Sequence, residues 1–274
     1  MERGLPPLEH DEFVALREVV HEVTGIALSN AKHTLVQTRL AKRLRELGMR
    51  DFASYVRHVQ HDMQGEREAL IAAMTTHTTH WWRERHHFDD LRKLVLEPAR
   101  ARRAKKLRIW SAAASSGEEP YCLAFSAAAA LDTKVCDVKI LATDIDPGVL
   151  QRAERGVYDA ATVAEHPDLA PYFTAGSGEN QGLAQVKPAY RELLRFRRLN
   201  LIDTHWPVRA VFDAIFIRNV LIYFDEPTQL RVATRLAEHL LPGGILVFGH
   251  SESMLGVRAG LRQVGRGAFS KGAL

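Results

Sequence analysis

The sequence has few of the features that mark secreted or membrane proteins. Its 274 residues include only two cysteines, Cys122 and Cys136, and each falls in an apolar segment. This usage fits a reducing compartment and does not suggest a disulfide framework. No apolar run approaches the ~18–20 residues of a membrane-spanning helix, and the N-terminus, MERGLPPLEHDEF, has acids where a signal peptide would be apolar. We therefore expect a cytoplasmic protein without direct membrane insertion.

Internal repeats, low-complexity tracts and the glycine pattern G-x-G-x-x-G are also absent from the sequence. The missing glycine pattern counts against a dinucleotide held by its pyrophosphate. Apolar residues make up 46% of the chain and charged residues 26%, the balance of a soluble globular protein with one large domain or two modest ones. The net charge of +4 favours an acidic partner but does not by itself imply nucleic acid.

The first part of the chain has the apolar spacing of helices. Apolar residues recur at three- and four-residue intervals over 13–23, 35–47 and 52–59, and a fourth such segment ends at Met74. Gly48 follows the second segment as a candidate C-cap. We predict an all-helical domain of about four helices over residues 1–75.

Charge is unevenly distributed in this helical part. Acids outnumber bases in the first thirty residues, whereas residues 31–60 carry seven basic and two acidic side chains. Arg39 and Arg43 are four residues apart and share a helix face, with Lys42 nearby. The face is either solvated surface or a binding site for an acidic partner.

Beyond a basic connection, EPARARRAKKLR at 97–108, strands alternate with helices. We predict strands at 107–113, 138–146, 212–219 and 245–250, helices at 118–131, 147–155 and 226–241, and a short hairpin at 261–274. Alternation of this kind predicts crossover units and a parallel sheet. Residues 156–200 interrupt it, hold Gly176, Gly178 and Gly182 close together, and end in a candidate strand, LLRFRRLN. An insertion of this length is usually functional or disordered.

Acidic residues follow the first two predicted strands, where a doubly wound sheet binds its ligands. Glu118 and Glu119 follow the small turn Ser115-Ser116-Gly117, and they would repel a pyrophosphate but suit a cationic amino group, such as the methionine part of S-adenosylmethionine. They could instead complement the dipole of the following helix. Asp144 ends the second strand and is placed to bind ribose hydroxyls, whereas Asp146 precedes Pro147 and is assigned to the helix cap.

The segment TTHTTHWWRERHHF, at 75–88, is rich in histidine, tryptophan and arginine. The histidines could in principle bind a metal ion. Because the histidine pairs lack an i, i+4 arrangement with a third ligand, we predict no metal. The two tryptophans could equally serve packing between domains. The segment at the end of the predicted strand 212–219 is RNVLIYFDEP, at 218–227. It has neither the Asn/Asp-Pro-Pro-Tyr sequence of amino-group methyltransferases nor the Pro-Cys of cytosine methyltransferases.

With these residues in view, the chain resembles the chemotaxis receptor methyltransferases (CheR), along nearly its whole length. The matching pieces stand in the family's order: TTHTTHWWRERHHF, IWSAAASSGEEPY, ILATDID, GVY, FDAIFIRNVLIYFD and LLPGGILVFGHSESM. Composition and periodicity alone lead only to a two-domain nucleotide-binding α/β protein. The resemblance implies a Rossmann-like class I methyltransferase domain at 107–274 with a small antiparallel β subdomain inserted at 156–200. It also implies the all-helical N-terminal domain at 1–75, for substrate recognition, and a linker with cofactor contacts at 76–106.

The resemblance further implies an enzyme that transfers a methyl group from S-adenosylmethionine to glutamate side chains of chemoreceptors, leaving S-adenosylhomocysteine. It places Arg83 and Tyr223 near the transferred methyl. The residues that it implies for S-adenosylmethionine are His77, Thr79, Arg83, Glu119, Asp144, Asn200, Leu201, Ile217, Arg218 and Asn219. His77 stands where the family usually has asparagine, and Trp81-Trp82 stand where it usually has two phenylalanines.

The expected partner is the cytoplasmic helical bundle of a chemoreceptor, bound through the basic face of Arg39, Lys42 and Arg43. A receptor's C-terminal peptide is a second expected partner, at the 156–200 subdomain. We expect a monomer that binds no nucleic acid. Two alternatives stay open: a signalling module that only binds S-adenosylmethionine, and a methyltransferase acting on nucleic acid or another acidic substrate.

Overall fold

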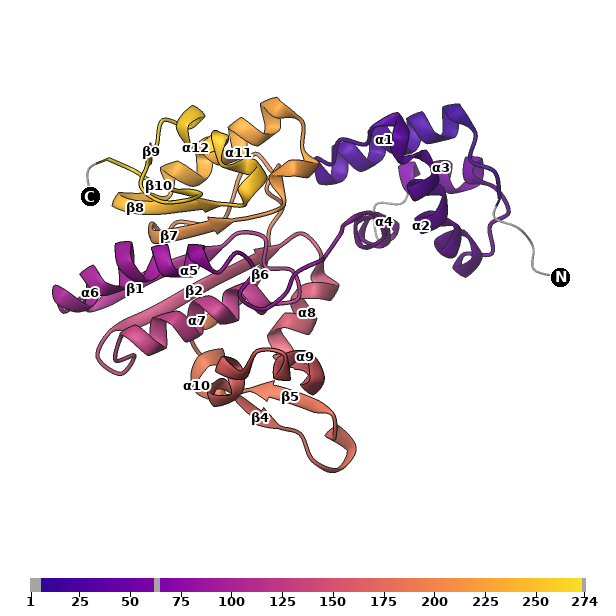
Figure 1. The fold of residues 1–274 in the computed structure, drawn as a ribbon. Coiled ribbons are helices and arrows are strands. Elements are labelled where there is room, and N and C mark those ends of the chain that lie inside the picture. The colour runs from indigo at the N-terminus through magenta and orange to yellow at the C-terminus, as the bar shows by residue number, and fades with distance from the viewer. Residues whose placement is uncertain (1–5, 62–64, 273–274) are drawn as a thin grey trace. The chain divides into compact units, whose positions relative to one another are not determined.

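The computed structural model describes residues 6–61 and 65–272, so parts of the predicted 1–75 and 107–274 domains lie outside the described residues. Contacts between Cα atoms divide the chain into two compact units. The helical unit comprises the described residues up to Thr76 together with Tyr223–Thr228, and the sheet unit comprises His77–Ile222 and Gln229–Leu274. Figure 1 traces the chain through both. No helix among the described residues is long and apolar enough to span a membrane.

Between residues 6 and 76, the described part of the helical unit holds the four predicted helices and a 3-10 turn: α1 (His10–Thr24), η1 (Asn30–Lys32), α2 (His33–Glu46), α3 (Phe52–His61) and α4 (Glu66–Met74). Their apolar faces form one core that includes the fully buried Leu16, Leu40 and Phe52. Gly25 ends α1 in the left-handed conformation, with φ of 75°, which glycine adopts at no steric cost. The prediction of an all-helical N-terminal domain is confirmed.

A buried carboxylate ties three of these helices together. Glu66, at the start of α4, accepts hydrogen bonds from Arg43 Nε and Nη2 of α2, at 2.9 and 2.7 Å, and from the Tyr55 hydroxyl of α3, at 2.8 Å. The Glu66 side chain is 1% exposed and that of Arg43 is 29% exposed. Burial and the bond to Glu66 raise the pKa of Tyr55 above its usual range. The bond to Glu66 likewise raises the pKa of Arg43.

The sheet unit is built on a seven-stranded sheet of order β6-β2-β1-β7-β8-β10-β9. The strands from β6 to β8 are parallel, and β10 and β9 add the predicted antiparallel hairpin at one edge. The strands are β1 (Lys106–Ser111), β2 (Asp137–Asp144), β6 (Leu194–Arg198), β7 (Phe212–Ile217), β8 (Leu240–Phe248), β9 (Arg262–Gln263) and β10 (Ala268–Ser270). The predicted Rossmann-like α/β fold is confirmed.

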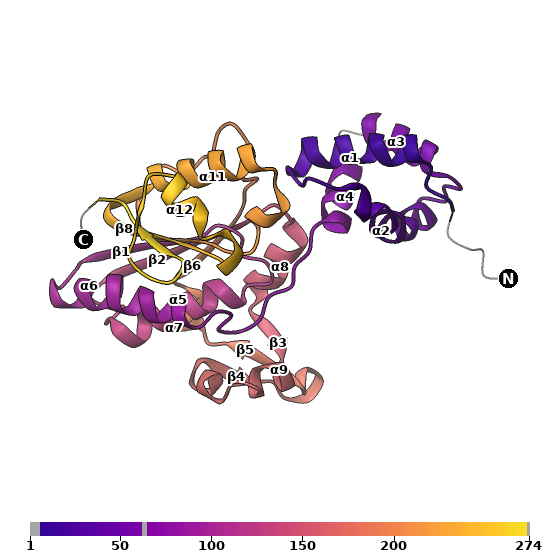
Figure 2. The same cartoon turned by 45° about the horizontal axis from the view of Figure 1, so that its top comes forward.

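Helices cover both faces of this sheet (Figures 1 and 2). One face carries α5 (His86–Leu91), α6 (Glu97–Ala101), α7 (Glu118–Ala130) and α8 (Pro147–Arg155), and the other carries α11 (Glu226–Glu238) and α12 (Met254–Arg258). Short 3-10 turns, η5 (Leu221–Tyr223) and η6 (His250–Glu252), follow β7 and β8.

Two sequence predictions differ from these bounds. The segment expected as a linker is largely helical, because α5, a π-helical stretch η2 (Arg92–Leu96) and α6 run together and bury Phe88, Leu91 and Ala99. The helix predicted at 226–241 ends at Glu238, and β8 begins at Leu240, ahead of the Pro-Gly-Gly run. A Cβ on Gly244 would lie 2.9 Å from the carbonyl oxygens of Leu241 and Phe212, so glycine permits this irregular strand.

The inserted segment forms a second, antiparallel sheet of order β3-β5-β4. Its elements are β3 (Val157–Asp159), α9 (Ala160–Ala164), η3 (Pro167–Tyr172), β4 (Phe173–Ala175), η4 (Gly178–Asn180), β5 (Leu183–Val186) and α10 (Pro188–Arg191). The candidate strand at the end of the 156–200 range is β6, which pairs with β2 in the large sheet.

Trp81 attaches this small sheet to the rest of the sheet unit. Its indole is 1% exposed and lies 4.8 Å from the ring of Tyr158, 5.4 Å from Phe173 and 6.3 Å from Phe125 of α7. Edge-to-face contacts of this kind add to the stabilisation from apolar burial. Trp81 therefore packs against residues of the sheet unit, and packing of the tryptophans between domains stays a prediction.

We predict that Arg43→Ala destabilises the helical unit, because it leaves the Glu66 carboxylate buried without its cation. The expected loss is about 2–4 kcal/mol, less than for a fully buried pair because Arg43 is partly exposed. Arg45→Ala, on the exposed side of the same helix, should change the free energy of unfolding by less than about 0.5 kcal/mol.

Urea unfolding followed by two probes measures this. All four tryptophans lie in the sheet unit, so a transition seen by far-ultraviolet circular dichroism and not by tryptophan fluorescence belongs to the helical unit. Equal midpoints of that transition for Arg43→Ala and Arg45→Ala would contradict the stabilising role of the pair.

Candidate active site

The carboxyl ends of β1, β2 and β7 meet at one edge of the large sheet. Ser111 at the end of β1 lies beside Ala142 of β2 on one side and Phe216 of β7 on the other. The turns that follow these strands therefore converge, which is where open α/β sheets bind ligands.

Asp144 organises the turn that follows β1. Its carboxylate is 8% exposed and accepts hydrogen bonds from the backbone N–H of Ser115, at 2.9 Å, and of Asp146, at 3.1 Å. Burial raises the pKa of Asp144, and the two N–H donors act against that rise. Ser115 has a φ of 48°, which is unusual for a residue other than glycine.

Asp146 caps helix α8, as predicted, by accepting a 2.7 Å hydrogen bond from the N–H of Gly148. Its second oxygen lies 2.9 Å from Nε2 of His77. The bond to His77 lowers the pKa of Asp146. The carbonyl of His77 also accepts a 3.0 Å bond from the Ser115 hydroxyl, so the segment before Trp81 is fastened to the ends of β1 and β2.

A second polar group lies between the ends of β1 and β7, centred on Arg218. Its guanidinium is 2% exposed and donates to Glu119 Oε2 at 2.8 Å and to the carbonyl oxygen of Arg83. The other oxygen of Glu119 accepts a 2.7 Å bond from the Ser111 hydroxyl. The side chains of Glu119 and Arg218, both predicted to bind cofactor, thus bind each other.

Arg83 lies on a strained stretch of backbone. Its neighbours Trp82 and Glu84 have φ of 54° and 53°, and Asn219, at the end of β7, has a φ of 58°. The Arg83 guanidinium donates a 2.9 Å hydrogen bond to the carbonyl of Thr78, and the Asn219 amide lies 3.3 Å from Glu84 Oε1. Strained residues of this kind cluster at functional sites.

Two further predicted residues follow β6, whose end lies next to Asp144. Leu199 donates its N–H to the carbonyl of Asp144 at 3.0 Å, which brings Asn200 and Leu201 to the same edge. The Asn200 carbonyl accepts a 3.2 Å bond from the indole of Trp206, and Leu201 is buried. Thr79 is half-buried between His77 and Arg83, and Ile217 is the buried last residue of β7.

Glu252 is a residue of the site that the sequence did not reveal. It follows β8, is 3% exposed, and accepts hydrogen bonds from the N–H groups of Asn219 at 2.7 Å, Val220 at 2.9 Å and Leu221 at 2.7 Å. Burial raises its pKa, against the effect of these donors. The carboxylate shapes the first part of the turn after β7, from Asn219 to Ile222. An acid shortly after a predicted strand was the available signal.

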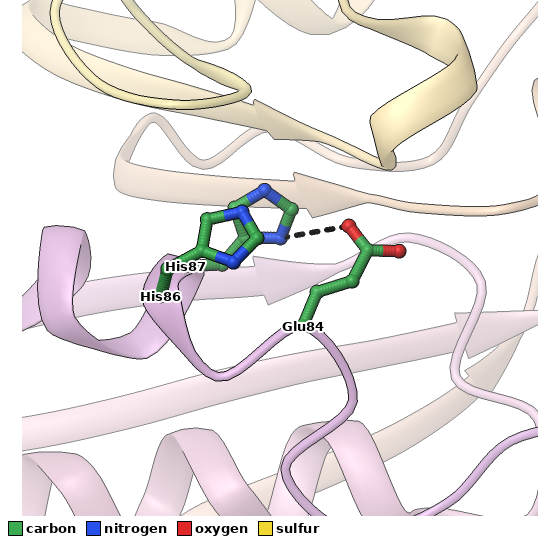
Figure 3. A group of neighbouring side chains, drawn as sticks. All are labelled: Glu84, His86 and His87. Carbon is green, nitrogen blue, oxygen red and sulfur yellow. Dashed lines mark ion pairs between the residues drawn. The ribbon is translucent and has the colours of Figure 1, made fainter.

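Glu84, His86 and His87 bring one candidate metal-ligand atom each within 4.8 Å of one another (Figure 3). Glu84 is the third donor that the histidine spacing failed to indicate. His87 Nδ1 lies 3.4 Å from Glu84 Oε2, and burial together with Arg218 lowers the pKa of His87 to about 3. Because Arg218 already supplies a cation 3.9 Å from Glu84, we assign no ion here, and the absence of a metal stays a prediction.

The remaining predicted residues belong to the helical unit. Tyr223 packs against the helical core, and its carbonyl accepts a 2.8 Å bond from the N–H of Ala27. Arg39 donates to the carbonyl of Met74 at 2.8 Å and to the Thr76 hydroxyl at 3.0 Å. With Arg43 bound to Glu66, only Lys42 of the predicted basic face is fully exposed.

Comparisons with known proteins agree with this architecture. Residues 77–268 match the family model "CheR methyltransferase, SAM binding domain", and residues 11–75 match "CheR methyltransferase, all-alpha domain". The chain is 42% identical over 264 residues to chemotaxis protein methyltransferase 2 of Pseudomonas aeruginosa, covering 95% of this chain and 92% of that protein. It is 39% identical over 249 residues to the chemotaxis protein methyltransferase of Escherichia coli, covering 90% and 85%. Both domain matches and these relatives place the chain in the CheR methyltransferase family.

Proposed function

We propose that this protein methylates glutamate side chains of chemoreceptors, with S-adenosylmethionine as methyl donor. The observation that carries the proposal is the match of both the helical and the sheet unit to chemotaxis methyltransferases along most of the chain. We further propose that it acts as a monomer in the cytoplasm. The rival with a nucleic-acid substrate is less well supported, since residues 218–227 lack both the Asn/Asp-Pro-Pro-Tyr and the Pro-Cys sequences of such methyltransferases.

The donor set at the strand ends fits S-adenosylmethionine. Asp144 offers a buried carboxylate at the end of β2, suited to ribose hydroxyls, and Glu119 offers one at the start of α7, suited to an amino group. Each oxygen of Glu119 already accepts one bond and has a further lone pair. The other residues proposed to bind it are His77, Thr79, Arg83, Asn200, Leu201, Ile217, Arg218 and Asn219.

We assign Arg218 a role through its backbone and through Glu119, because its guanidinium is turned to the interior. His77 is proposed to act through Asp146, to which it is hydrogen-bonded. In these roles Arg218 orients Glu119, and His77 orients Asp146 beside Asp144.

Catalysis by this chain is proposed to consist mainly of positioning. S-adenosylmethionine supplies an activated methyl group on a sulfonium. A substrate glutamate has an ordinary pKa of ~4.3 and is ionised at neutral pH, so no general base is needed. Arg83 holds the carboxylate through its fork of donors, and Tyr223 orients it or lines the path of the methyl group. Correct alignment can contribute up to roughly 7–11 kcal/mol.

Transfer of radiolabelled methyl groups to receptor-containing membranes tests the function. We expect label in a base-labile ester, and none when the receptor's methylated glutamates are replaced by alanine.

Arg83→Lys keeps the charge but loses the planar fork of donors, and should lower kcat by about ten- to a hundredfold. The matched control is Arg85→Lys, on an exposed neighbour bound to Asp168. Label in nucleic acid, or full activity of Arg83→Lys, would count against these assignments.

We predict that Asp144→Asn weakens S-adenosylmethionine and S-adenosylhomocysteine alike, because both would share the ribose contact. The expected loss is about 1–3 kcal/mol for charge-assisted hydrogen bonds. Asparagine keeps one acceptor, which can serve the N–H of Ser115, but its amide nitrogen then faces the N–H of Asp146, so the melting temperature is measured alongside to establish that the variant is folded. Calorimetric titration measures both affinities, with Asp159→Asn, at the cap of α9, as control. Unchanged affinities in Asp144→Asn would remove this residue from the site.

The basic face of α2 is proposed to meet the acidic receptor bundle mainly through Lys42. Arg39 and Arg43 add to the local potential, but their internal partners give them structural roles as well. Lys42→Glu should raise the Michaelis constant for receptor and flatten its salt dependence, with cofactor affinity unchanged. The matched control is Lys134→Glu, which makes the same charge change at an exposed position before β2. Identical salt responses in both variants would leave the face as solvated surface.

The small antiparallel sheet is proposed to bind a receptor's C-terminal peptide by strand addition. Strand β4 lies at the edge of the β3-β5-β4 order, where backbone groups can pair with an extended peptide. Gly178 and Gly182, with φ of 60° and 85°, form the turn beside it. The guanidinium groups of Arg195 and Arg197 are not proposed to bind the peptide, since they already donate to the carbonyls of Leu194 and Phe196 on β6. Equal methylation of tailed and tailless receptors would argue against this role.

A further inference from the structure

The turn between β7 and α11 has two parts: residues 219–222 are bonded to Glu252 of the sheet unit, whereas the residues from Tyr223 onward group with the helical unit. Residues Tyr223–Thr228 cluster with the helices, although β7 and most of α11 belong to the sheet unit. This turn carries Tyr223, the residue proposed to lie near the transferred methyl. Whatever fixes the turn therefore fixes that tyrosine.

Three backbone and side-chain contacts fix the turn to the end of α1. Ile26 forms an isolated antiparallel bridge with Phe224, and the N–H of Ala27 donates to the Tyr223 carbonyl at 2.8 Å. Thr24 shapes the chain just before them, with its hydroxyl accepting a 3.0 Å bond from the N–H of Ile26. Ile26 and Phe224 are both buried, at 9% and 8% exposure, so the bridge is shielded from water.

The third contact joins two helix ends. His21 Nε2, in the last turn of α1, lies 3.0 Å from Asp225 Oδ2. The other oxygen of Asp225 accepts the N–H of Thr228 at 2.9 Å, as a cap at the start of α11. Bonds from Thr228, followed by the bond from His21, lower the pKa of Asp225, so this carboxylate is ionised at neutral pH. One carboxylate thus links the end of α1 to the first turn of α11.

We propose that His21 is a positioning residue for methyl transfer, which acts through Asp225 and the Ile26–Phe224 bridge on the placement of Tyr223. In this arrangement the end of α1 sets the backbone position of Tyr223 within the helical unit. The inference rests on the proposed function, because it takes Tyr223 to be close to the transferred methyl.

The test compares four single variants and one double variant of the chain, using purified receptor membranes and labelled S-adenosylmethionine. His21→Ala removes the ring that bonds Asp225, and Asp225→Asn removes the negative charge while asparagine retains the cap of α11. Both should lower kcat by about two- to fivefold, the range that a half-exposed pair can supply. The dissociation constant of S-adenosylmethionine and the Michaelis constant for receptor should stay within about twofold. The double variant should be no slower than the slower single one, because both remove the same contact.

The matched control is Glu22→Ala. Glu22 follows His21 on α1 and pairs at 3.7 Å with Arg67 of α4, so its removal perturbs the helical unit without touching the turn. His21→Gln, whose amide can still donate to Asp225, should recover part of the lost kcat. Additive losses in the double variant, an equal loss in Glu22→Ala, or an unchanged kcat in His21→Ala would each overturn the proposal. An inactive wild type would instead refute the proposed function.

Discussion

A buried guanidinium at the end of β7 determines much of the geometry of the site. Arg218 cannot be taken out of water without a counter-charge, and Glu119 provides it from the first turn of α7. A second nitrogen of the guanidinium, Nη2, donates to the carbonyl of Arg83, so the segment with strained backbone is bonded to the sheet by the same group. Removal of one partner of a fully buried pair typically costs about 3–5 kcal/mol. The positions of Arg83, Glu119 and Asn219 therefore depend on each other.

Carboxylates that accept backbone N–H groups shape the other turns of the site in the same way. Asp144 holds the turn after β1, Asp146 the start of α8, Asp225 the start of α11 and Glu252 the turn after β7. Each satisfies donors that a strand end or helix start would otherwise leave unpaired. The chain thus forms its ligand-binding edge with acids, and this composition suits a ligand that carries positive charge rather than a phosphate.

The sequence predicted the fold correctly in those segments where the apolar periodicity and the residues at the two ends indicate the same element. The four helices, the bounds of α8 and the C-terminal hairpin all follow from apolar spacing and from proline or glycine at the ends. Prediction failed at α5–α6, because the basic residues around Ala99 concealed an apolar stripe. It also failed at β8, where Pro242-Gly243-Gly244 is typical of a turn but lies within an irregular strand.

For the site, the sequence could indicate which residues lie at strand ends but not how their side chains pair. Nothing in the spacing of Glu119 and Arg218, ninety-nine positions apart, predicts a direct bond. The role of Glu252 and the attachment of Tyr223 to α1 likewise arise only from long-range contacts. Helical periodicity did place Arg39 and Arg43 on one face, but it could not show that both would find partners inside the helical unit.

Strand β6, at one edge of the large sheet, is protected against pairing with the same strand of another molecule. An edge strand presents unpaired carbonyls, and a second molecule can add a strand to them. On β6 the carbonyls of Leu194 and Phe196 are occupied by the guanidinium groups of Arg195 and Arg197, each only one residue away. The same side chains place like charges along the edge, which repel an identical strand from another copy. Strand β6 can thus end the sheet without becoming a starting point for aggregation.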